Sequence, residues 1–241
     1  MLKREVLPVK ITTLLTPKEL NPDLVDGKVV VVADILRFST TVLTAIHNQA
    51  RVILPVASPE QAVSLYESLG KKGVLLCGER GGLRIEGFHL GNSPLEYGLA
   101  TVRDKTLIIT TTNGTRVLLK TTGARTVQIG GFLNLSSLRE EVSRADEIVL
   151  ICCGQEDRFA LEDLLFCGAL ARSLAPAEVD DATRAAIELY EKITDLTRAL
   201  LATDHGRELE RLGFKEDVLY SAQVDLFETT ARYHEGRITR G

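Results

Sequence analysis

The sequence predicts an α/β fold, in which helices cover both faces of a mostly parallel sheet in a three-layer α/β/α arrangement. Six short runs rich in Val, Ile and Leu are mostly continuous rather than alternating, which is typical of strands buried on both faces. Helical patterns lie between these runs, and such alternation favours a parallel sheet. The chain has 241 residues, 44% of them hydrophobic, and we interpret it as a single domain over residues 1–241.

The predicted strands lie at residues 28–36, 51–57, 73–79, 106–112, 126–132 and 147–154. The predicted helices lie at residues 40–50, 58–72, 93–102, 114–123 and 134–145, with a further one after the last strand, within 155–170. Ser58-Pro59 and Ser93-Pro94 each combine an N-cap residue with proline at the first helical position. From about residue 180 to residue 241 we predict a helical C-terminal segment packed on the sheet, charged on one face and apolar on the other.

Composition argues against several classes of protein. The formal net charge is −4 and no long basic run occurs, so we expect no nucleic-acid partner. The N-terminus lacks the apolar core of a signal peptide, and no apolar run reaches the ~18 residues of a membrane span. The cysteines fit no zinc spacing, and we interpret them as core residues of a reduced, cytoplasmic protein. They are Cys77, Cys152, Cys153 and Cys167.

Two polar turns follow predicted strands, at the sheet edge where ligands of open α/β sheets gather. Each turn combines hydroxyl groups with an arginine just before a helix, a setting that suits a phosphate or sulfonate. Threonine and asparagine also cap helices, which is the structural alternative. The first turn contains Arg37, Ser39, Thr40 and Thr41. The second contains Thr111, Thr112, Asn113, Gly114, Thr115 and Arg116.

A glycine-rich segment, "CGERGGLRIEGFHLGNSP" at residues 77–94, follows the third predicted strand. Its length and composition favour an ordered loop over a site, with Arg80, Arg84 and Asn92 as candidate ligand-binding residues. The alternative is a mobile surface loop. The histidines show no metal spacing, and His89 in this segment is the one that we consider for chemistry.

Carboxylates accompany these turns. Asp34 ends a buried strand, where a charge is costly unless it is paired or bound to a metal. Glu79 has the same placement, whereas Glu162 and Asp163 begin a helix, where acidic residues also simply favour the helix dipole. Oxygen ligands next to anion-binding turns suggest Mg²⁺, so these four residues are our candidate metal ligands.

Four segments together resemble the 2-phosphosulfolactate phosphatase family (ComB). They are "VADILRFSTTVLTAI", "GERGGLRIEGFHLGNSPLEY", "TTTNGTRVL" and "CCGQEDRFALEDLLFCGAL", in the order of the family and within residues 31–170. The resemblance implies a Mg²⁺-dependent phosphatase that hydrolyses (R)-2-phospho-3-sulfolactate to 3-sulfolactate and phosphate, in coenzyme M or sulfolactate biosynthesis. It also implies an α/β/α fold with two interlocked subdomains. The chain departs from the family pattern at Asp157 and at Cys152 or Cys153.

Such a substrate has phosphate, carboxylate and sulfonate groups on three carbons, so its site needs several cations. We expect Mg²⁺ and five arginines to meet this need, because phosphoryl transfer depends on positioning and charge neutralisation. These arginines are Arg37, Arg80, Arg84, Arg116 and Arg158. A metal-activated water is the simplest nucleophile, and Asp34 or Cys153 are alternatives. Our candidate catalytic residues are therefore Asp34, Cys153 and Arg116.

Two other functions remain open. A non-catalytic module that binds a phosphorylated or sulfonated small acid would explain the polar turns but not the carboxylates. A phosphosugar isomerase or aldolase would need a lysine or histidine base at a strand end, and none is evident there. The oligomeric state is also open, with a homodimer as one alternative.

Overall fold

The computed structural model describes residues 9–241. The prediction about a signal peptide concerns residues 1–10 and so lies almost entirely outside the described residues. The strands are β1 Lys10–Leu14, β2 Val29–Ala33, β3 Val52–Pro55, β4 Val74–Arg80, β5 Leu83–Arg84, β6 Thr106–Thr110, β7 Thr126–Gly130, β8 Glu147–Cys152, β9 Glu178–Val179, β10 Ala231–His234 and β11 Arg237–Arg240. The helices are α1 Pro22–Val25, α2 Phe38–His47, α3 Pro59–Ser68, α4 Leu99–Val102, α5 Gly114–Leu118, α6 Leu135–Val142, α7 Leu161–Leu174, α8 Asp181–Glu191, α9 Leu196–Ala202, α10 Asp204–Arg211 and α11 Lys215–Ser221. Short 3₁₀ turns lie at Pro17–Glu19, Pro94–Glu96 and Phe132–Asn134.

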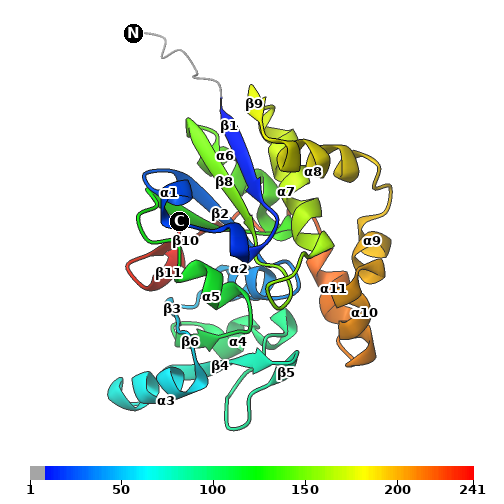
Figure 1. Ribbon diagram of the computed structural model, residues 1–241. Coiled ribbons are helices and arrows are strands. Elements are labelled where there is room, and N and C mark those ends of the chain that lie inside the picture. The colour runs from blue at the N-terminus through cyan, green and yellow to red at the C-terminus, as the bar shows by residue number, and fades with distance from the viewer. Residues whose placement is uncertain (1–8) are drawn as a thin grey trace.

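The strands form one mixed, mostly parallel sheet in the order β5-β4-β6-β3-β11-β10-β7-β2-β8-β1-β9 (Figure 1). All six predicted strands are present, and they fall into two parallel groups. β3, β6 and β4 make one group, and β7, β2 and β8, continued by β1 and β9, make the other. The antiparallel hairpin β10–β11 lies between the groups, because β10 pairs with β7 and β11 pairs with β3.

This hairpin corrects the prediction of a helical segment as far as residue 241. The helices end at Ser221, and Ala231–Arg240 is extended. A turn at Glu235 and Gly236 joins the two strands, and both residues have positive φ, at 47° and 77°. Two consecutive residues with positive φ are what a tight hairpin turn needs, and glycine adopts this conformation easily.

The predicted helix at 93–102 is also shorter than expected. It splits into the 3₁₀ turn Pro94–Glu96 and the one-turn helix α4. Ser93 makes no capping hydrogen bond at this start. Glu96 Oε2 accepts a hydrogen bond from the Gly91 N–H at 2.7 Å, so this carboxylate stabilises the end of the glycine-rich loop instead.

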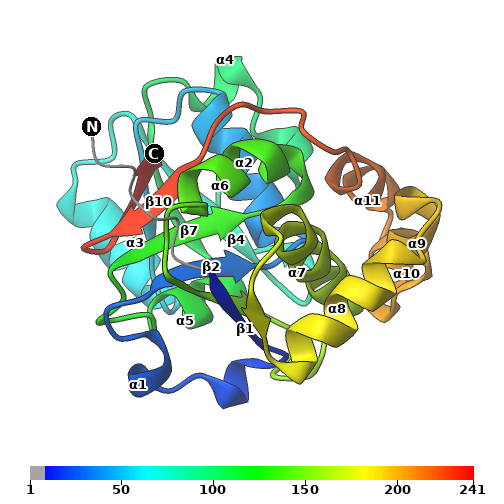
Figure 2. The same cartoon turned by 90° about the horizontal axis from the view of Figure 1, so that it is seen from above.

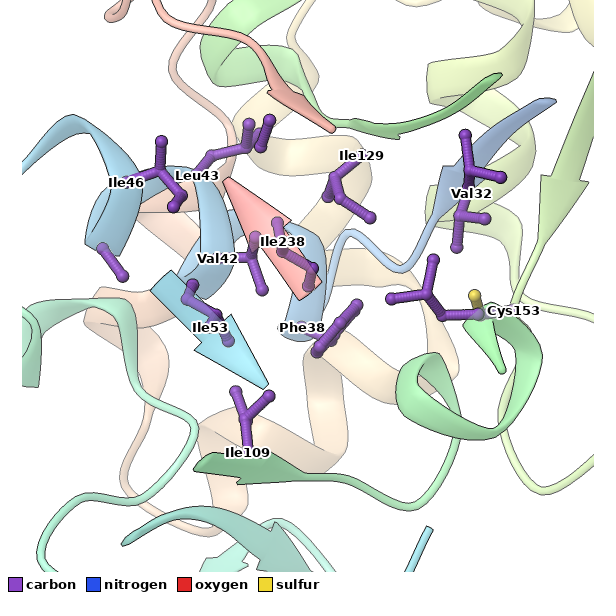
Figure 3. Packing of buried hydrophobic residues seen from close by; sticks show 14 of the residues in the cluster. Val32, Phe38, Val42, Leu43, Ile46, Ile53, Ile109, Ile129, Cys153 and Ile238 are labelled. Carbon is purple, nitrogen blue, oxygen red and sulfur yellow. The ribbon is translucent and has the colours of Figure 1, made fainter. Parts of the chain in front are cut away.

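The core lies on both faces of β2, whose five residues are all buried. Val30 and Val32 pack in a cluster with α2, and Val29 and Val31 pack in a second cluster with α6 and α7. Ile238 of the hairpin belongs to the first cluster and lies close to Phe38 and Val42 of α2 (Figure 3). The hairpin is therefore part of the main core rather than an appendage.

Helices α8–α11 gather along one side of the molecule, beyond α7, and α3 lies at the opposite end (Figures 1 and 2). Apolar side chains from these helices, including Ala186, Leu200, Leu209 and Val218, pack into the cluster on α7. Over residues 9–241, no helix is both long enough and apolar enough to cross a lipid bilayer.

Candidate active site

A small pocket of about 60 Å³ lies where β2, β4, β6 and β8 end, and helix α10 covers it. The carboxyl ends of parallel strands are where the fold class places its ligands. The pocket brings together residues from all four of the segments that resembled one family. Its lining residues are Asp34, Leu36, Arg37, Glu79, Gly81, Gly82, Asn92, Thr111, Thr112, Asn113, Gln155, Glu156, His205, Glu208, Leu209 and Leu212.

Asp34 is 94% buried at the end of β2, yet it lines the pocket. Its Oδ1 accepts a hydrogen bond from the Phe38 N–H at 3.3 Å, whereas its Oδ2 accepts none from residues 9–241. Burial is the main cause that raises the pKa of Asp34 to about 7, against the lowering effect of the nearby His205 charge. Asp34 therefore has one carboxylate oxygen available to a ligand.

Gly114 explains how helix α5 can begin so close to Asp34. A Cβ atom at this position would lie 2.4 Å from Phe38 Cδ1 and 2.7 Å from Asp34 Oδ2. Because real Cβ atoms do not approach that closely, only glycine fits here without moving the carboxylate. Gly114 thus acts by leaving space and is not itself among the pocket residues.

His205 is a pocket residue that the sequence analysis missed. It lies in the first turn of α10, and its Nδ1 is 3.2 Å from Oε1 of Glu162, a buried residue of α7. Burial lowers the pKa of His205, but the hydrogen bond to Glu162 and the charges of Glu162, Asp34 and Glu208 outweigh burial and raise it overall. No local signal marks this residue, because a single histidine on an amphipathic helix looks like part of a solvated face.

Glu79 joins two loops of the pocket. Its Oε1 accepts the Thr112 N–H at 2.8 Å, and its Oε2 accepts the Gly82 N–H at 2.9 Å and the Thr112 hydroxyl at 3.3 Å. The carboxylate is therefore occupied by donors from the glycine-rich loop and from the turn after β6. This arrangement makes Glu79 an organiser of the pocket wall rather than a free metal ligand.

Asp163 and Glu162, the other two candidate metal ligands, do not line the pocket. Asp163 accepts the Ile35 N–H at 2.8 Å and the Gly154 N–H at 3.0 Å, so it connects the loops after β2 and β8. Burial, with the nearby acidic groups, raises the pKa of Asp163 well above its ordinary value. Within residues 9–241, no three or more His, Cys, Asp or Glu side chains group as a metal-binding set.

Arg37 lines the pocket, but its guanidinium is already bound. Its Nη1 lies 2.6 Å from Oδ2 of Asp217 on α11, and its Nη2 donates to the Gly82 carbonyl at 2.6 Å. The group also stacks over the Phe214 ring, 4.3 Å from its centroid. Arg37 therefore connects α11 to the glycine-rich loop.

The hydroxyls after Arg37 do not reach the pocket, which corrects their assignment as substrate-binding groups. All three are buried and bonded to neighbouring backbone. Thr40 donates to the Ile35 carbonyl at 2.9 Å and Thr41 donates to the Asn92 carbonyl at 2.8 Å. Ser39 accepts a hydrogen bond from the Asp34 N–H at 3.0 Å. These side chains anchor the start of α2 to the loop after β2 and to the glycine-rich segment.

The turn after β6 contributes in part. Thr111, Thr112 and Asn113 line the pocket. Thr115 is buried and exchanges hydrogen bonds with Thr111, so it stabilises the turn from within. The Asn113 Oδ1 accepts the Glu156 N–H at 3.0 Å, which links this turn to the loop after β8.

Four predicted arginines lie outside the pocket. Arg80 donates to the Glu79 carbonyl and to Thr110, and Arg84 is exposed on β5. The Arg116 side chain is 46% exposed and lies 3.8 Å from Asp157, and that of Arg158 is 75% exposed. The structure thus does not bring the expected arginine cluster together.

Cys153 is a core residue and not a reactive thiol. It is fully buried and packs in the apolar cluster near Val32 (Figure 3). Burial, together with the charges of Asp34 and Asp163, raises its pKa well above the ordinary thiol value. Because the thiolate is the nucleophilic form, this environment rules against Cys153 as a nucleophile. His89 is structural too, since its Nδ1 accepts the Leu76 N–H at 2.9 Å.

Asn92 is the remaining predicted residue that lines the pocket. It is buried, and its Oδ1 has no hydrogen-bond partner among residues 9–241. An unsatisfied buried oxygen costs about 1–3 kcal/mol. Such a group at a pocket wall is typical of a site whose ligand completes its bonds.

The pocket has an acidic balance of charge. Four carboxylates line it, from Asp34, Glu79, Glu156 and Glu208. The cationic side chains of the lining are Arg37 and His205, and Arg37 is already paired with Asp217. An anionic ligand therefore needs additional positive charge to enter this pocket.

This chain is similar to known proteins over most of its length. The family model described as 2-phosphosulpholactate phosphatase matches residues 14–236. A "Probable 2-phosphosulfolactate phosphatase" of Symbiobacterium thermophilum is 38% identical over 218 residues, covering 88% of this chain and 94% of the relative. A protein of the same description from Thermotoga maritima is 37% identical over 206 residues, covering 85% and 88%. One from Clostridium novyi is 31% identical over 236 residues, covering 96% and 100%. The chain belongs to the 2-phosphosulpholactate phosphatase family, as its four signature segments indicated.

Proposed function

We propose that this protein is a phosphatase that hydrolyses (R)-2-phospho-3-sulfolactate to 3-sulfolactate and phosphate. One observation supports this most strongly. The four segments that resemble the family contribute lining residues from Asp34 to Glu156, far apart in the sequence, yet all of them line one pocket. The names of the curated relatives agree with this reaction.

We also propose that the site works with Mg²⁺. The pocket offers oxygen ligands, and Mg²⁺ is usually bound by one or two carboxylates, with water and substrate phosphate completing its shell. Asp34 through Oδ2 and Asn92 through Oδ1 are the residues that would hold the ion, because neither oxygen has a partner among residues 9–241. When bound, the ion supplies charge neutralisation for the phosphoryl group and lowers the pKa of a bound water.

The acidic balance of the pocket supports this requirement for a cation. The substrate has phosphate, carboxylate and sulfonate groups. The two cationic side chains of the pocket lining each already contact a carboxylate outside the pocket, Arg37 with Asp217 and His205 with Glu162. Without added positive charge, four carboxylates would repel such a substrate. For the nucleophile, we propose water as the simplest choice and Asp34 as the alternative, and we rank Cys153 below both because its thiol is buried in the apolar core.

A direct assay tests the proposal. Purified protein is incubated with (R)-2-phospho-3-sulfolactate or 2-phospholactate, with Mg²⁺ or with excess EDTA, and phosphate release is measured. We expect release that depends on Mg²⁺ and is faster with the sulfonated substrate. The Asp34→Asn variant should be inactive, and Asp104→Asn, which changes an exposed carboxylate, should retain wild-type rates.

The same assay, together with isothermal titration calorimetry, distinguishes the phosphatase from a non-catalytic binding module. A module that only binds the acid would give heat on titration with phosphosulfolactate but no phosphate release, with or without Mg²⁺. Such a result would refute the proposal that the protein is a phosphatase. Full activity in excess EDTA would support the phosphatase activity but refute the proposed requirement for a metal ion.

We retain three finer predictions as proposals. The two parallel groups of strands, joined by the hairpin β10–β11, would correspond to two interlocked subdomains. The protein would work in the cytoplasm, in coenzyme M or sulfolactate biosynthesis. A homodimer remains an alternative to a monomer, and light scattering of the purified protein would decide between them.

A further inference from the structure

The histidine that covers the pocket has a fixed orientation. His205 is the second residue of α10, and the N-cap of that helix is closed by Thr203, whose Oγ1 accepts the Gly206 N–H at 2.9 Å. Glu162 Oε1 lies 3.2 Å from Nδ1, and the two side chains are 16% and 2% exposed. Nε2 has no partner among residues 9–241, and the residue lines the pocket. One ring nitrogen is therefore anchored and the other is available to a ligand.

The surroundings of His205 favour the imidazolium form. Acidic groups face it from three elements: Glu162 of α7, Asp34 after β2, and Glu208 of α10 itself. Burial alone would disfavour the charge, but these groups raise the pKa of His205 above its ordinary value. Glu162 is occupied by this contact and does not line the pocket, so we do not count it as a metal ligand.

The proposed reaction needs a proton donor. The bond from phosphorus breaks toward the C2 oxygen of a hydroxy acid, and an aliphatic alkoxide is a poor leaving group unless it is protonated. General acid catalysis by a positioned histidine typically contributes ~10²–10⁴ in rate. No other pocket residue of the described chain combines a dissociable N–H with a buried partner that fixes its orientation.

Resting on the proposed function, we propose that His205 is the general acid of the reaction and that Glu162 is its positioning residue. The Nε2 proton moves to the bridging oxygen as the P–O bond breaks, and water adds to phosphorus. One proton of that water stays on the product as hydrogen phosphate. The other returns to His205, so the products are 3-sulfolactate and phosphate and the enzyme is restored.

Leaving-group dependence tests this role. In the His205→Gln variant, kcat/KM for 2-phospholactate should fall by ~10²–10⁴. For its 3,3,3-trifluoro analogue, whose hydroxyl is much more acidic, the loss should be below about tenfold, because that oxygen leaves without a proton. An equal loss on both esters would overturn the proposal. His234→Asn is the matched control, since that histidine is exposed on the hairpin and should leave both rates unchanged.

The pH profile supplies a second readout. Wild-type kcat/KM for phosphosulfolactate should fall at alkaline pH as His205 loses its proton, and this limb should vanish in His205→Gln. Glu162→Gln should move the limb to lower pH while keeping the activity at its acidic end, as expected of a positioning residue. An alkaline limb that persists unchanged in His205→Gln would refute the assignment.

Two further controls keep the test decisive. Glu162 is buried, so His205→Gln could unfold the protein. The double variant Glu162→Gln/His205→Gln removes the unpaired charge and should fold while showing the same loss of rate. If wild type does not hydrolyse phosphosulfolactate, the proposed function fails. If wild type is active and a phosphohistidine at His205 is trapped, only the proton-donor role fails.

Discussion

Arg37 and Asp217 form a buried ion pair, with Nη1 and Oδ2 2.6 Å apart and both side chains 2% exposed. The pair joins the beginning of α2 to α11 across 180 residues of sequence. Ser93 donates a further hydrogen bond to Asp217 Oδ1 at 2.6 Å. The Asp217 carboxylate therefore attaches α11 to residues that surround the pocket. Helix α10, which supplies His205, packs against α11.

Removing one partner of the pair should be strongly destabilising. Asp217→Asn leaves the Arg37 charge buried without its counterion, and we expect the free energy of unfolding to fall by about 3–5 kcal/mol. Urea unfolding followed by circular dichroism measures this. Glu178→Gln is the matched control, because it breaks an exposed pair with Lys10 and should leave the urea midpoint close to that of wild type. A similar cost for both variants would contradict this account.

Asp34 should make stability depend on pH. Its pKa is raised in the folded state from an ordinary value near 3.8 to about 7, so its contribution to stability is complete below about pH 4 and is lost as the pH rises through 7. Asp34→Asn should therefore gain stability relative to wild type between pH 4 and 8, by up to about 4 kcal/mol.

Urea unfolding at pH 5 and pH 8, in EDTA so that no metal contributes, measures this difference. The Asp104→Asn variant, which changes an exposed carboxylate, should have the same free energy of unfolding as wild type at both pH values. A difference between Asp34→Asn and wild type that does not change with pH would show that the carboxyl group is not perturbed as described.

Gly114→Ala should damage the site by filling space. The new methyl group would meet Phe38 Cδ1 at 2.4 Å and Asp34 Oδ2 at 2.7 Å, so both must move. We expect a loss of stability of about 1–3 kcal/mol and a fall in kcat of at least about tenfold. Gly98→Ala is the control, because its Cβ meets nothing within 4 Å. Unchanged kcat in Gly114→Ala would refute the spatial argument.

Arg116 gives the opposite expectation from the one that its sequence motif suggested. Its side chain is 46% exposed and outside the pocket, so Arg116→Lys should keep kcat/KM within about threefold of wild type. Arg37→Lys should be damaging, because lysine cannot bond Asp217 and the Gly82 carbonyl with one planar group. Steady-state kinetics of the two variants would decide; a severe loss in Arg116→Lys would restore the sequence-based assignment.

The order of strands and helices could be predicted wherever the signal was local. β2 is an unbroken run of buried apolar residues, and its end at Asp34 marks the ligand-binding edge of the sheet. Helix α2 also follows from local periodicity, and α3 follows from periodicity together with its Ser58 cap. The hairpin β10–β11 was missed because its two strands have four residues each and only Ala231 and Ile238 are buried. Its place between the two parallel groups comes from pairing with β3 and β7, which local sequence does not specify.

By itself the sequence determined the fold class, the family and the residues that reach the pocket from the strand ends: Asp34, Glu79, Asn92 and the turn after β6. It did so because a carboxylate or a polar turn after a buried strand is visible within a few residues. Only the tertiary structure decided which polar groups are free. Side chains that looked alike in the motifs differ in their surroundings: Arg37 pairs with Asp217, 180 residues away, whereas Thr40 bonds the nearby Ile35 carbonyl and Arg116 is exposed. The same long-range packing brings Glu162 of α7 to His205 of α10, a contact between residues 43 apart that no local pattern encodes.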